Sequence, residues 1–94
     1  MDMDSLRKEI DEADAQLLDA FQRRMRLALD VGRQKMAAGR PITDPARERQ
    51  VRERALQRCD KDLRQYVEPL YNTLLSLSRD YQRRALAPAG HGDA

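Results

Sequence analysis

The hydrophobic pattern at the start of the chain is that of one long helix. Residues 3–38 contain no Pro and a single Gly, and Asp4 or Ser5 can cap the start. Positions at alternating spacings of three and four share one helix face. Here that face is Arg7, Ile10, Asp14, Leu17, Phe21, Arg24, Ala28, Val31 and Lys35, beside a second stripe at Leu6, Ala13, Ala20 and Leu27. The pattern predicts about 36 residues of helix, roughly 54 Å long.

A loop and a second helix follow. Gly39 is a natural stop for the first helix, and Pro41 cannot continue it. Asp44 is placed to cap the next helix, with Pro45 at its first position, where the missing N–H costs nothing. We expect this helix over residues 45–60, with a narrow apolar face formed by Val51, Ala55, Leu56 and Cys59.

A third helix is predicted over residues 62–86, after a polar break at residues 60–62. Its apolar seam is Leu63, Val67, Leu70, Leu74, Leu77 and Tyr81. Pro69 lies inside it and removes one backbone bond, which can bend the helix or delay its start. No segment shows a strand pattern, so the expected fold class is all-α with three helices. We expect residues 1–86 to form one domain, followed by a disordered tail over residues 87–94.

The length of the first helix bears on the oligomeric state. A compact chain of 94 residues has a radius of gyration of about 12 to 13 Å. A helix of roughly 54 Å would project from such a globule with its apolar face bare. A second copy of the chain is the simplest cover, so we predict an interlocked homodimer in which the two long helices pack together.

Composition fits such a protein. Hydrophobic residues make up 40% and charged residues 36%, and the net charge of +2 is small, which favours helices with wet outer faces over disorder. Arg greatly outnumbers Lys; Arg suits carboxylate or phosphate recognition, although genomic base composition explains the excess equally well. Cys59 is the only cysteine, and no signal pattern or long apolar run occurs, so we expect a cytoplasmic protein without a membrane partner.

Three cations occupy the predicted apolar face of the first helix. Arg7, Arg24 and Lys35 alternate there with buried-type residues, and burying a cation is costly unless it is paired. Structural pairing with Asp14, or side chains extended to water near the helix ends, is one explanation. The other is a pocket whose ligand carries more than one negative group.

Polar residues on the other two helices can complete such a pocket. Ser78 and Gln82 are four apart and share one face; they either face solvent or supply a hydroxyl and an amide. Arg47 and Glu48 fall in the first turn after Asp44, where free backbone N–H groups can bind an anion or a hydroxyl oxygen. Glu48 is favoured there by the helix dipole in any case, or it accepts a hydroxyl hydrogen.

Together these segments resemble the all-helical chorismate mutases, the AroQ class. The matching pieces are LRKEIDEADAQLL, RRMRLALDVGRQK, GRPITDPARE and SRDYQ. They cover about residues 6–84 in order. The resemblance implies an interlocked dimer with two equivalent sites that rearranges chorismate to prephenate, on the route to phenylalanine and tyrosine.

The resemblance also implies a role for each residue at the two charged ends of the substrate. Arg7 would reach from the partner chain to one carboxylate, and Arg24 would bind the other with help from Ser78. Lys35 would contact a carboxylate and the ether oxygen. Gln82 would donate to the same ether oxygen.

The ring hydroxyl would be held by Glu48 and the backbone at Asp44, with Arg47 close by. By the same resemblance, the reaction is a unimolecular rearrangement that needs no nucleophile, metal or cofactor. The chain offers little for such chemistry, since its single His91 lies in the predicted tail and its single Cys59 in the narrow-faced second helix.

Three other functions remain open at this stage. An isochorismate-pyruvate lyase on the same fold would share the cations and Gln82, but we would not expect it to carry the full TDPARE helix start. A catalytically silent helical dimer, acting as a regulatory or interaction module, is a second possibility. Nucleic-acid binding is suggested by RERQVRERALQR and a pI near 9.0, but acidic residues nearly balance the basic ones and aromatic residues for stacking are scarce.

Overall fold

The computed structural model describes residues 1–87. Within them lie three α-helices and one short 3₁₀ turn, and no strand: α1 (Met3–Ala37), α2 (Pro45–Arg58), η1 (Lys61–Leu63) and α3 (Arg64–Ala85). The predicted all-α class with one long helix and two shorter ones is therefore confirmed. From residue 88 on, the predicted tail lies outside the described residues. No helix in the described range is long and apolar enough to cross a membrane.

The ends of α1 are set by local signals, one of which differs from the prediction. The N-cap is Asp2, whose carboxylate accepts a hydrogen bond from the Ser5 N–H at 2.7 Å. The expected caps, Asp4 and Ser5, both lie inside the helix, where Asp4 adds negative charge to the first turn. At the other end Gly39 has a positive φ of 68°, the left-handed conformation that lets the chain leave a helix.

The boundaries of the other helices differ by a few residues. α2 begins at the predicted Pro45 but ends at Arg58, because the backbone of Cys59 is extended and η1 follows after it. α3 starts at Arg64 instead of residue 62, since the 3₁₀ turn occupies the first positions. Pro69 lies inside α3 as predicted.

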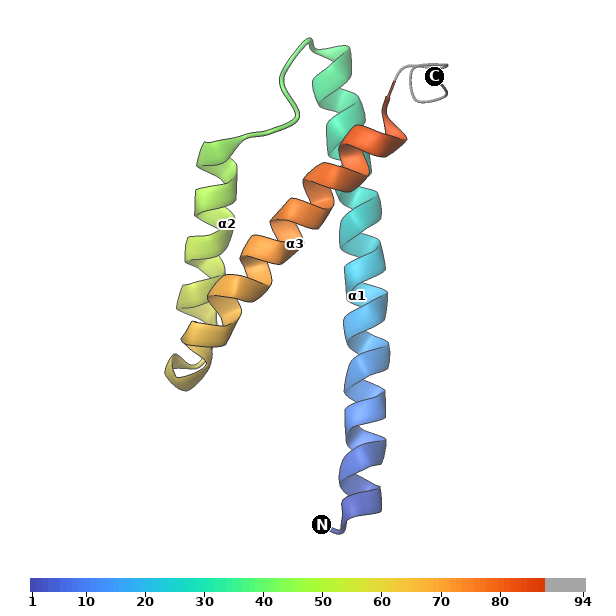
Figure 1. Cartoon of the computed structure of the whole chain (residues 1–94), viewed down its shortest axis with the longest axis vertical. Helices are drawn as coiled ribbons and strands as arrows, with labels where there is room; N and C mark the ends of the chain where they lie inside the picture. The colour runs from blue at the N-terminus through green and yellow to red at the C-terminus, as the bar shows by residue number, and fades with distance from the viewer. Residues whose placement is uncertain (88–94) are drawn as a thin grey trace.

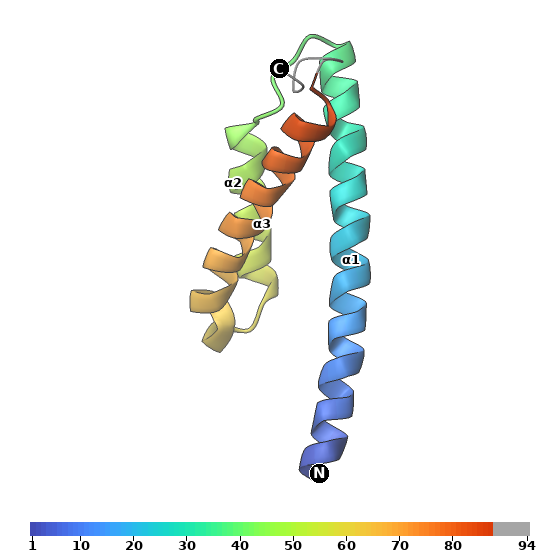
Figure 2. The same cartoon turned by 45° about the vertical axis from the view of Figure 1, so that its right-hand side comes forward.

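The three helices form an open arrangement in which α3 is the central element. α3 contacts both α1 and α2, whereas α1 and α2 do not pack on each other. Figures 1 and 2 show α3 crossing α1 near the C-terminal end of α1 and running beside α2. The N-terminal half of α1 extends away from the rest of the chain. The resulting shape is elongated, 54 × 29 × 21 Å, with a radius of gyration of 16.9 Å.

The single chain buries very little apolar surface. Among the described residues Leu75 is the only hydrophobic side chain in the buried class. The predicted apolar seam of α3 is largely exposed, with Leu63, Leu70 and Leu77 between 44% and 55% accessible. Within the single chain α3 turns a different face toward its neighbours, that of Leu75, Ser78 and Gln82. The predicted inner face of α1 is also exposed through its N-terminal half, with Leu17 65% accessible.

Candidate active site

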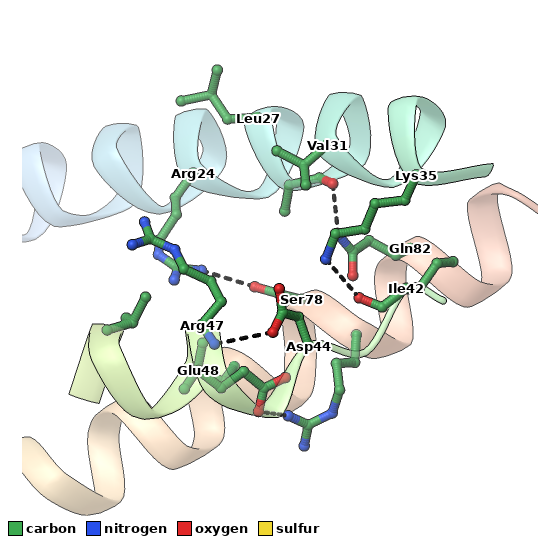
Figure 3. Close-up of a pocket in the computed structure, with 14 residues that line it drawn as sticks. Arg24, Leu27, Val31, Lys35, Ile42, Asp44, Arg47, Glu48, Ser78 and Gln82 are labelled. Carbon is green, nitrogen blue, oxygen red and sulfur yellow. Dashed lines mark hydrogen bonds and ion pairs between the residues drawn. The ribbon is translucent and has the colours of Figure 1, made fainter. Parts of the chain in front are cut away.

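One pocket lies where the C-terminal half of α1, the start of α2 and the C-terminal half of α3 meet (Figure 3). Its volume is about 270 Å³, near the lower end of the range for small-ligand sites. Polar and charged side chains from all three helices line it, on a partly apolar wall. The lining residues are Arg24, Leu27, Ala28, Val31, Lys35, Ile42, Asp44, Arg47, Glu48, Val51, Leu75, Ser78, Arg79 and Gln82.

The wall from α1 carries two of the predicted cations. Arg24 and Lys35 are eleven residues apart in the sequence, which places them on one face about 16 Å apart along the axis. Arg24 donates to the Ser78 hydroxyl oxygen at 3.0 Å. Lys35 donates to the carbonyl oxygen of Ile42 at 3.0 Å, so the loop after α1 folds back over the pocket. Lys35 retains further N–H donors for a ligand, because an ammonium group has three.

The wall from α3 carries the predicted hydroxyl and amide. Ser78 and Gln82 are each only 7% exposed, so the alternative that they face solvent is excluded. Gln82 donates through Nε2 to the Ala28 carbonyl oxygen at 2.7 Å. A primary amide has two N–H donors, and one of them remains for a ligand. The Ser78 hydroxyl donates to the Leu74 carbonyl oxygen at 3.0 Å.

A close approach of α3 to α1 holds Gln82 in this position. Gly32 is the one buried residue of α1, and it lies against the last turn of α3. A Cβ at this position would be 2.6 Å from Leu86 Cδ1 and 3.5 Å from Gln82 Cγ. A side chain at Gly32 would therefore displace the end of the Leu86 side chain, while its Cβ would make an ordinary van der Waals contact with Gln82.

The start of α2 closes the third side of the pocket. Asp44 caps the helix as predicted, and its carboxylate accepts from the Arg47 N–H at 3.1 Å. Arg47 extends its side chain along α2 and donates to Gln50 at 2.6 Å. Glu48 is also in the first turn, with its side chain only 16% exposed. The predicted trio thus lies beside the two cations of α1.

Seven of the fourteen lining residues were not among the predicted site residues, and Arg79 is the only charged one of them. Arg79 donates to a carboxylate oxygen of Glu48, across the packed surface of α2 and α3. Arg79 follows Ser78 directly, and adjacent helical positions point in different directions, so spacing alone could not place both at one pocket. The sequence marks Arg79 only as an extra cation beside the proposed pocket, which either faces solvent or tunes the carboxylate site.

Arg7 does not reach this pocket. It is 17 positions before Arg24, which is about 26 Å along the axis of a helix, and it is exposed in the projecting half of α1. The remaining predicted site residues all line the pocket. Within one chain, therefore, Arg7 is separated from every other residue of the predicted set.

The pocket is suited to an anionic ligand. Four cationic side chains and two carboxylates line it, which leaves an excess of two positive charges. A low-dielectric, half-enclosed site strengthens attraction between such charges and a bound anion. In residues 1–87 there is no group of three or more His, Cys, Asp or Glu side chains arranged to hold a metal ion.

Comparison with known proteins identifies the family. The family described as "Chorismate mutase type II" matches residues 6–83. This range includes all three helices almost in full, together with every lining residue of the pocket. The chain belongs to the type II chorismate mutase family.

A curated relative carries the same family name. It is the intracellular chorismate mutase of Mycolicibacterium smegmatis (strain ATCC 700084 / mc(2)155). The two sequences are 42% identical over 53 residues. That match covers 56% of this chain and 51% of the relative, so it spans about half the length of each protein. No solved structure matches the chain. The resemblance to the all-helical chorismate mutases is therefore confirmed at the level of the family.

The Asp44 cap at the start of α2 gives a testable prediction about the stability of this chorismate mutase family member. Replacing Asp44 by Ala removes the acceptor for the Arg47 N–H, so the free energy of unfolding should fall by about 1 kcal/mol. Asp44→Asn keeps a cap of similar strength and should leave stability nearly unchanged. Thermal unfolding followed by circular dichroism measures both.

A matched control for this change lies at the other end of the chain. Asp2→Ala removes the equivalent cap of α1, so it should lower stability by a similar amount. Equal melting temperatures for wild type and Asp44→Ala would contradict the capping role.

Proposed function

We propose that the chain catalyses the rearrangement of chorismate to prephenate, a step toward phenylalanine and tyrosine. The observation that carries this is the convergence of seven predicted site residues from three helices on one cationic pocket, in a member of the chorismate mutase family. The seven are Arg24, Lys35, Asp44, Arg47, Glu48, Ser78 and Gln82. The proposed catalytic domain comprises residues 1–86, and its location is intracellular, as the name of the relative states for that protein.

The proposed mechanism rests on positioning and charge. Chorismate is a flexible dianion, and its rearrangement requires a folded conformer in which the two reacting carbons approach each other. Holding that conformer lowers the activation barrier, because the entropy lost in folding the substrate is already lost on binding. Arg24, supported by the Ser78 hydroxyl, binds one carboxylate. The hydrogen bond from Arg24 to Ser78 fixes the guanidinium before the ligand arrives.

The second part of the mechanism acts on the bond that breaks. As the C–O bond opens, negative charge grows on the ether oxygen, and donors fixed at that point stabilise the transition state. Lys35 and Gln82 are those donors. They lie on facing walls of the pocket, and each is held by a hydrogen bond to a backbone carbonyl, of Ile42 and Ala28 respectively. Glu48 and the backbone at Asp44 hold the ring hydroxyl, with Arg47 beside them.

The functional unit in this proposal is a homodimer. The chain exposes 7762 Å², whereas a compact monomer of its mass exposes about 5,600 Å². Burying an excess of about 2,000 Å² on each of two chains is typical of obligate dimers. An apolar groove between α1 and α3 supplies the surface. Its lining includes Leu17, Phe21, Leu70 and Leu77, and at one end it borders the pocket at Arg24.

A second copy of the chain in this groove would bring its Arg7 to the pocket. If the two α1 helices pack antiparallel, a partner residue 7 opposite residue 28 puts the twofold axis midway, between Leu17 and Leu18. These two leucines are 65% and 56% exposed in the single chain. In this arrangement Arg7 of the partner subunit lies at the pocket and binds the second carboxylate.

The activity is tested by following the loss of chorismate absorbance with purified protein and by converting the product with acid to phenylpyruvate. Turnover that yields phenylpyruvate supports the proposal. A folded dimer that leaves chorismate unchanged would contradict it. The same assay with isochorismate would then reveal a lyase by the release of pyruvate.

The shared site is tested by mixing two inactive chains. Arg7→Ala alone should lower kcat/KM by about 10- to 100-fold, since it removes a charge-assisted contact. When Arg7→Ala and Lys35→Ala chains are unfolded and refolded together in equal amounts, half of the dimers are mixed. Each mixed dimer holds one site with both residues intact, so activity should recover to about a quarter of wild type.

A matched pair of chains serves as the control for this mixing experiment. Arg24→Ala and Lys35→Ala both alter the pocket within one chain, so their mixed dimers contain no intact site and should stay inactive. Failure of the Arg7→Ala mixture to recover, in dimers confirmed to be mixed, would exclude the partner role of Arg7.

A further inference from the structure

The ion pair of Arg79 with Glu48 has no part in the proposed chemistry so far. It links α3 to the first turn of α2, and both residues line the pocket. Both side chains are partly buried, at 28% and 16% exposure, so solvent weakens this pair less than it weakens an exposed one. Arg52 lies 3.9 Å from the same carboxylate oxygen, Oε1. Within residues 1–87, Oε2 of Glu48 has no hydrogen-bond partner.

A carboxylate in this pocket has competing partners. Lys35 and Arg47 line the same cavity as Glu48, and the positive charge of each attracts an anionic ligand. If the Glu48 side chain turned toward either of them, it would neutralise a cation that the ligand uses. In the structure the Glu48 carboxylate instead accepts a hydrogen bond from Arg79. A cation that donates a hydrogen bond to one oxygen also restricts the rotamer of the carboxylate.

We propose that Arg79 is a positioning residue that holds Glu48 through Oε1, so that Oε2 is presented to the ring hydroxyl of the substrate and the Glu48 carboxylate does not neutralise Lys35 or Arg47. This inference rests on the proposed function. It assigns Arg79 an effect on substrate that passes through Glu48.

A direct effect of charge is the competing explanation, because a cation at the pocket edge also attracts a dianion from a distance. The two explanations differ in whether Glu48 is required. A double-mutant cycle on kcat/KM for chorismate separates them, with Arg79→Ala, Glu48→Gln and the combined variant. If Arg79 acts through Glu48, its removal matters only while the carboxylate is present.

The expected outcome is a loss of about tenfold in kcat/KM for Arg79→Ala, carried mainly by KM, as for removal of one charge-assisted hydrogen bond. In the Glu48→Gln background the further loss should be below about twofold. Arg79→Lys should recover most of the activity, since it keeps the charge near Glu48. Arg84→Ala is the matched control, because Arg84 is one turn further on, is exposed and pairs only with Asp80 in the described part of the chain; it should match wild type.

Each other outcome overturns the inference. Equal losses from Arg79→Ala in both backgrounds would assign Arg79 a direct attraction for the dianion. Wild-type kcat/KM in Arg79→Ala would leave it no role in the site. A loss in Arg79→Lys as large as in Arg79→Ala, with both chains folded by circular dichroism at the assay temperature, would also exclude a charge-based hold on Glu48. Absence of turnover in the wild type would overturn the proposed function, and the role of Arg79 with it.

Discussion

Replacing Lys35 by Ala should lower kcat for chorismate by about 10² to 10³-fold, the loss measured when one donor to a developing oxyanion is removed. Lys35 is half-buried at the C-terminal end of α1, where it faces Gln82 across the pocket (Figure 3). In the proposed mechanism the charge that Lys35 stabilises grows as the C–O bond opens, so the loss should appear in kcat as well as in KM.

The same substitution has a separate structural consequence, which is small. The bond from Lys35 to the Ile42 carbonyl oxygen ties the loop after α1 to the helix, and its removal costs about 1 kcal/mol of stability. For a chain of this size that lowers the melting temperature by about 4 to 8 °C. A loss of rate well below the melting temperature therefore reports on chemistry instead of unfolding.

A neighbouring cation on α1 serves as the control. Arg33 is exposed, and its ion pair in the described structure is with Asp30 at 3.0 Å on the same helix. Arg33→Ala removes one positive charge two positions from Lys35 without altering the pocket, so its kcat should be that of wild type. A kcat for Lys35→Ala within about threefold of Arg33→Ala would contradict the role of Lys35 at the ether oxygen.

Local signals in the sequence were sufficient to place most helix ends. Asp44 with Pro45 predicts the start of α2 to the residue, because the cap and the proline both act within one turn. Gly39 marks the end of α1 for the same kind of reason. The start of α1 was misplaced, since Asp2, Asp4 and Ser5 are all acceptable caps and the energy differences among them are small.

The packing of α3 could not be predicted from its apolar pattern. The pattern selects Leu70 and Leu77 as the inner seam, yet the single chain buries Leu75, Ser78 and Gln82. Apolar periodicity shows which face avoids water but not what covers it. In the proposed dimer a second chain covers the seam of Leu70 and Leu77, and α1 and α2 of the same chain cover the face with Ser78 and Gln82.

Two contacts at the site could not be predicted from the sequence, because they depend on how the helices lie relative to one another. Arg79 meets Glu48 only because α2 and α3 pack side by side. Gln82 reaches Ala28 only because α3 packs on α1. Both distances follow from tertiary structure, whereas the residue types that make the contacts were visible in the sequence.

Replacing Gln82 by Glu should make activity depend on pH. The amide nitrogen of Gln82 donates at every pH, but a carboxyl group donates only when it is protonated. At neutral pH the ionised carboxylate would repel the charge growing on the ether oxygen, and kcat/KM should fall by about 10² to 10³-fold. Gln82 is 7% exposed, and burial raises the pKa of a carboxyl group above its ordinary value of about 4.3.

The direction of the pH dependence of Gln82→Glu follows from the need for a protonated carboxyl group. The active fraction of Gln82→Glu is the protonated one, so kcat/KM should rise about tenfold for each unit by which the pH falls, until the pH reaches the pKa of the new carboxyl. Wild type should change little over the same range, because an amide does not titrate. Rates for chorismate measured from pH 8 to pH 5 test this directly.

Gln82→Ala separates protonation from other effects of acid. It removes the donor at every pH, so its rate should stay low and flat while that of Gln82→Glu climbs toward wild type. A climb in both variants would mean that acid acts elsewhere on the enzyme or the substrate. A flat profile for Gln82→Glu would mean that the group at this position is not a donor to the ether oxygen, and the stabilisation of that oxygen would then fall to Lys35 alone.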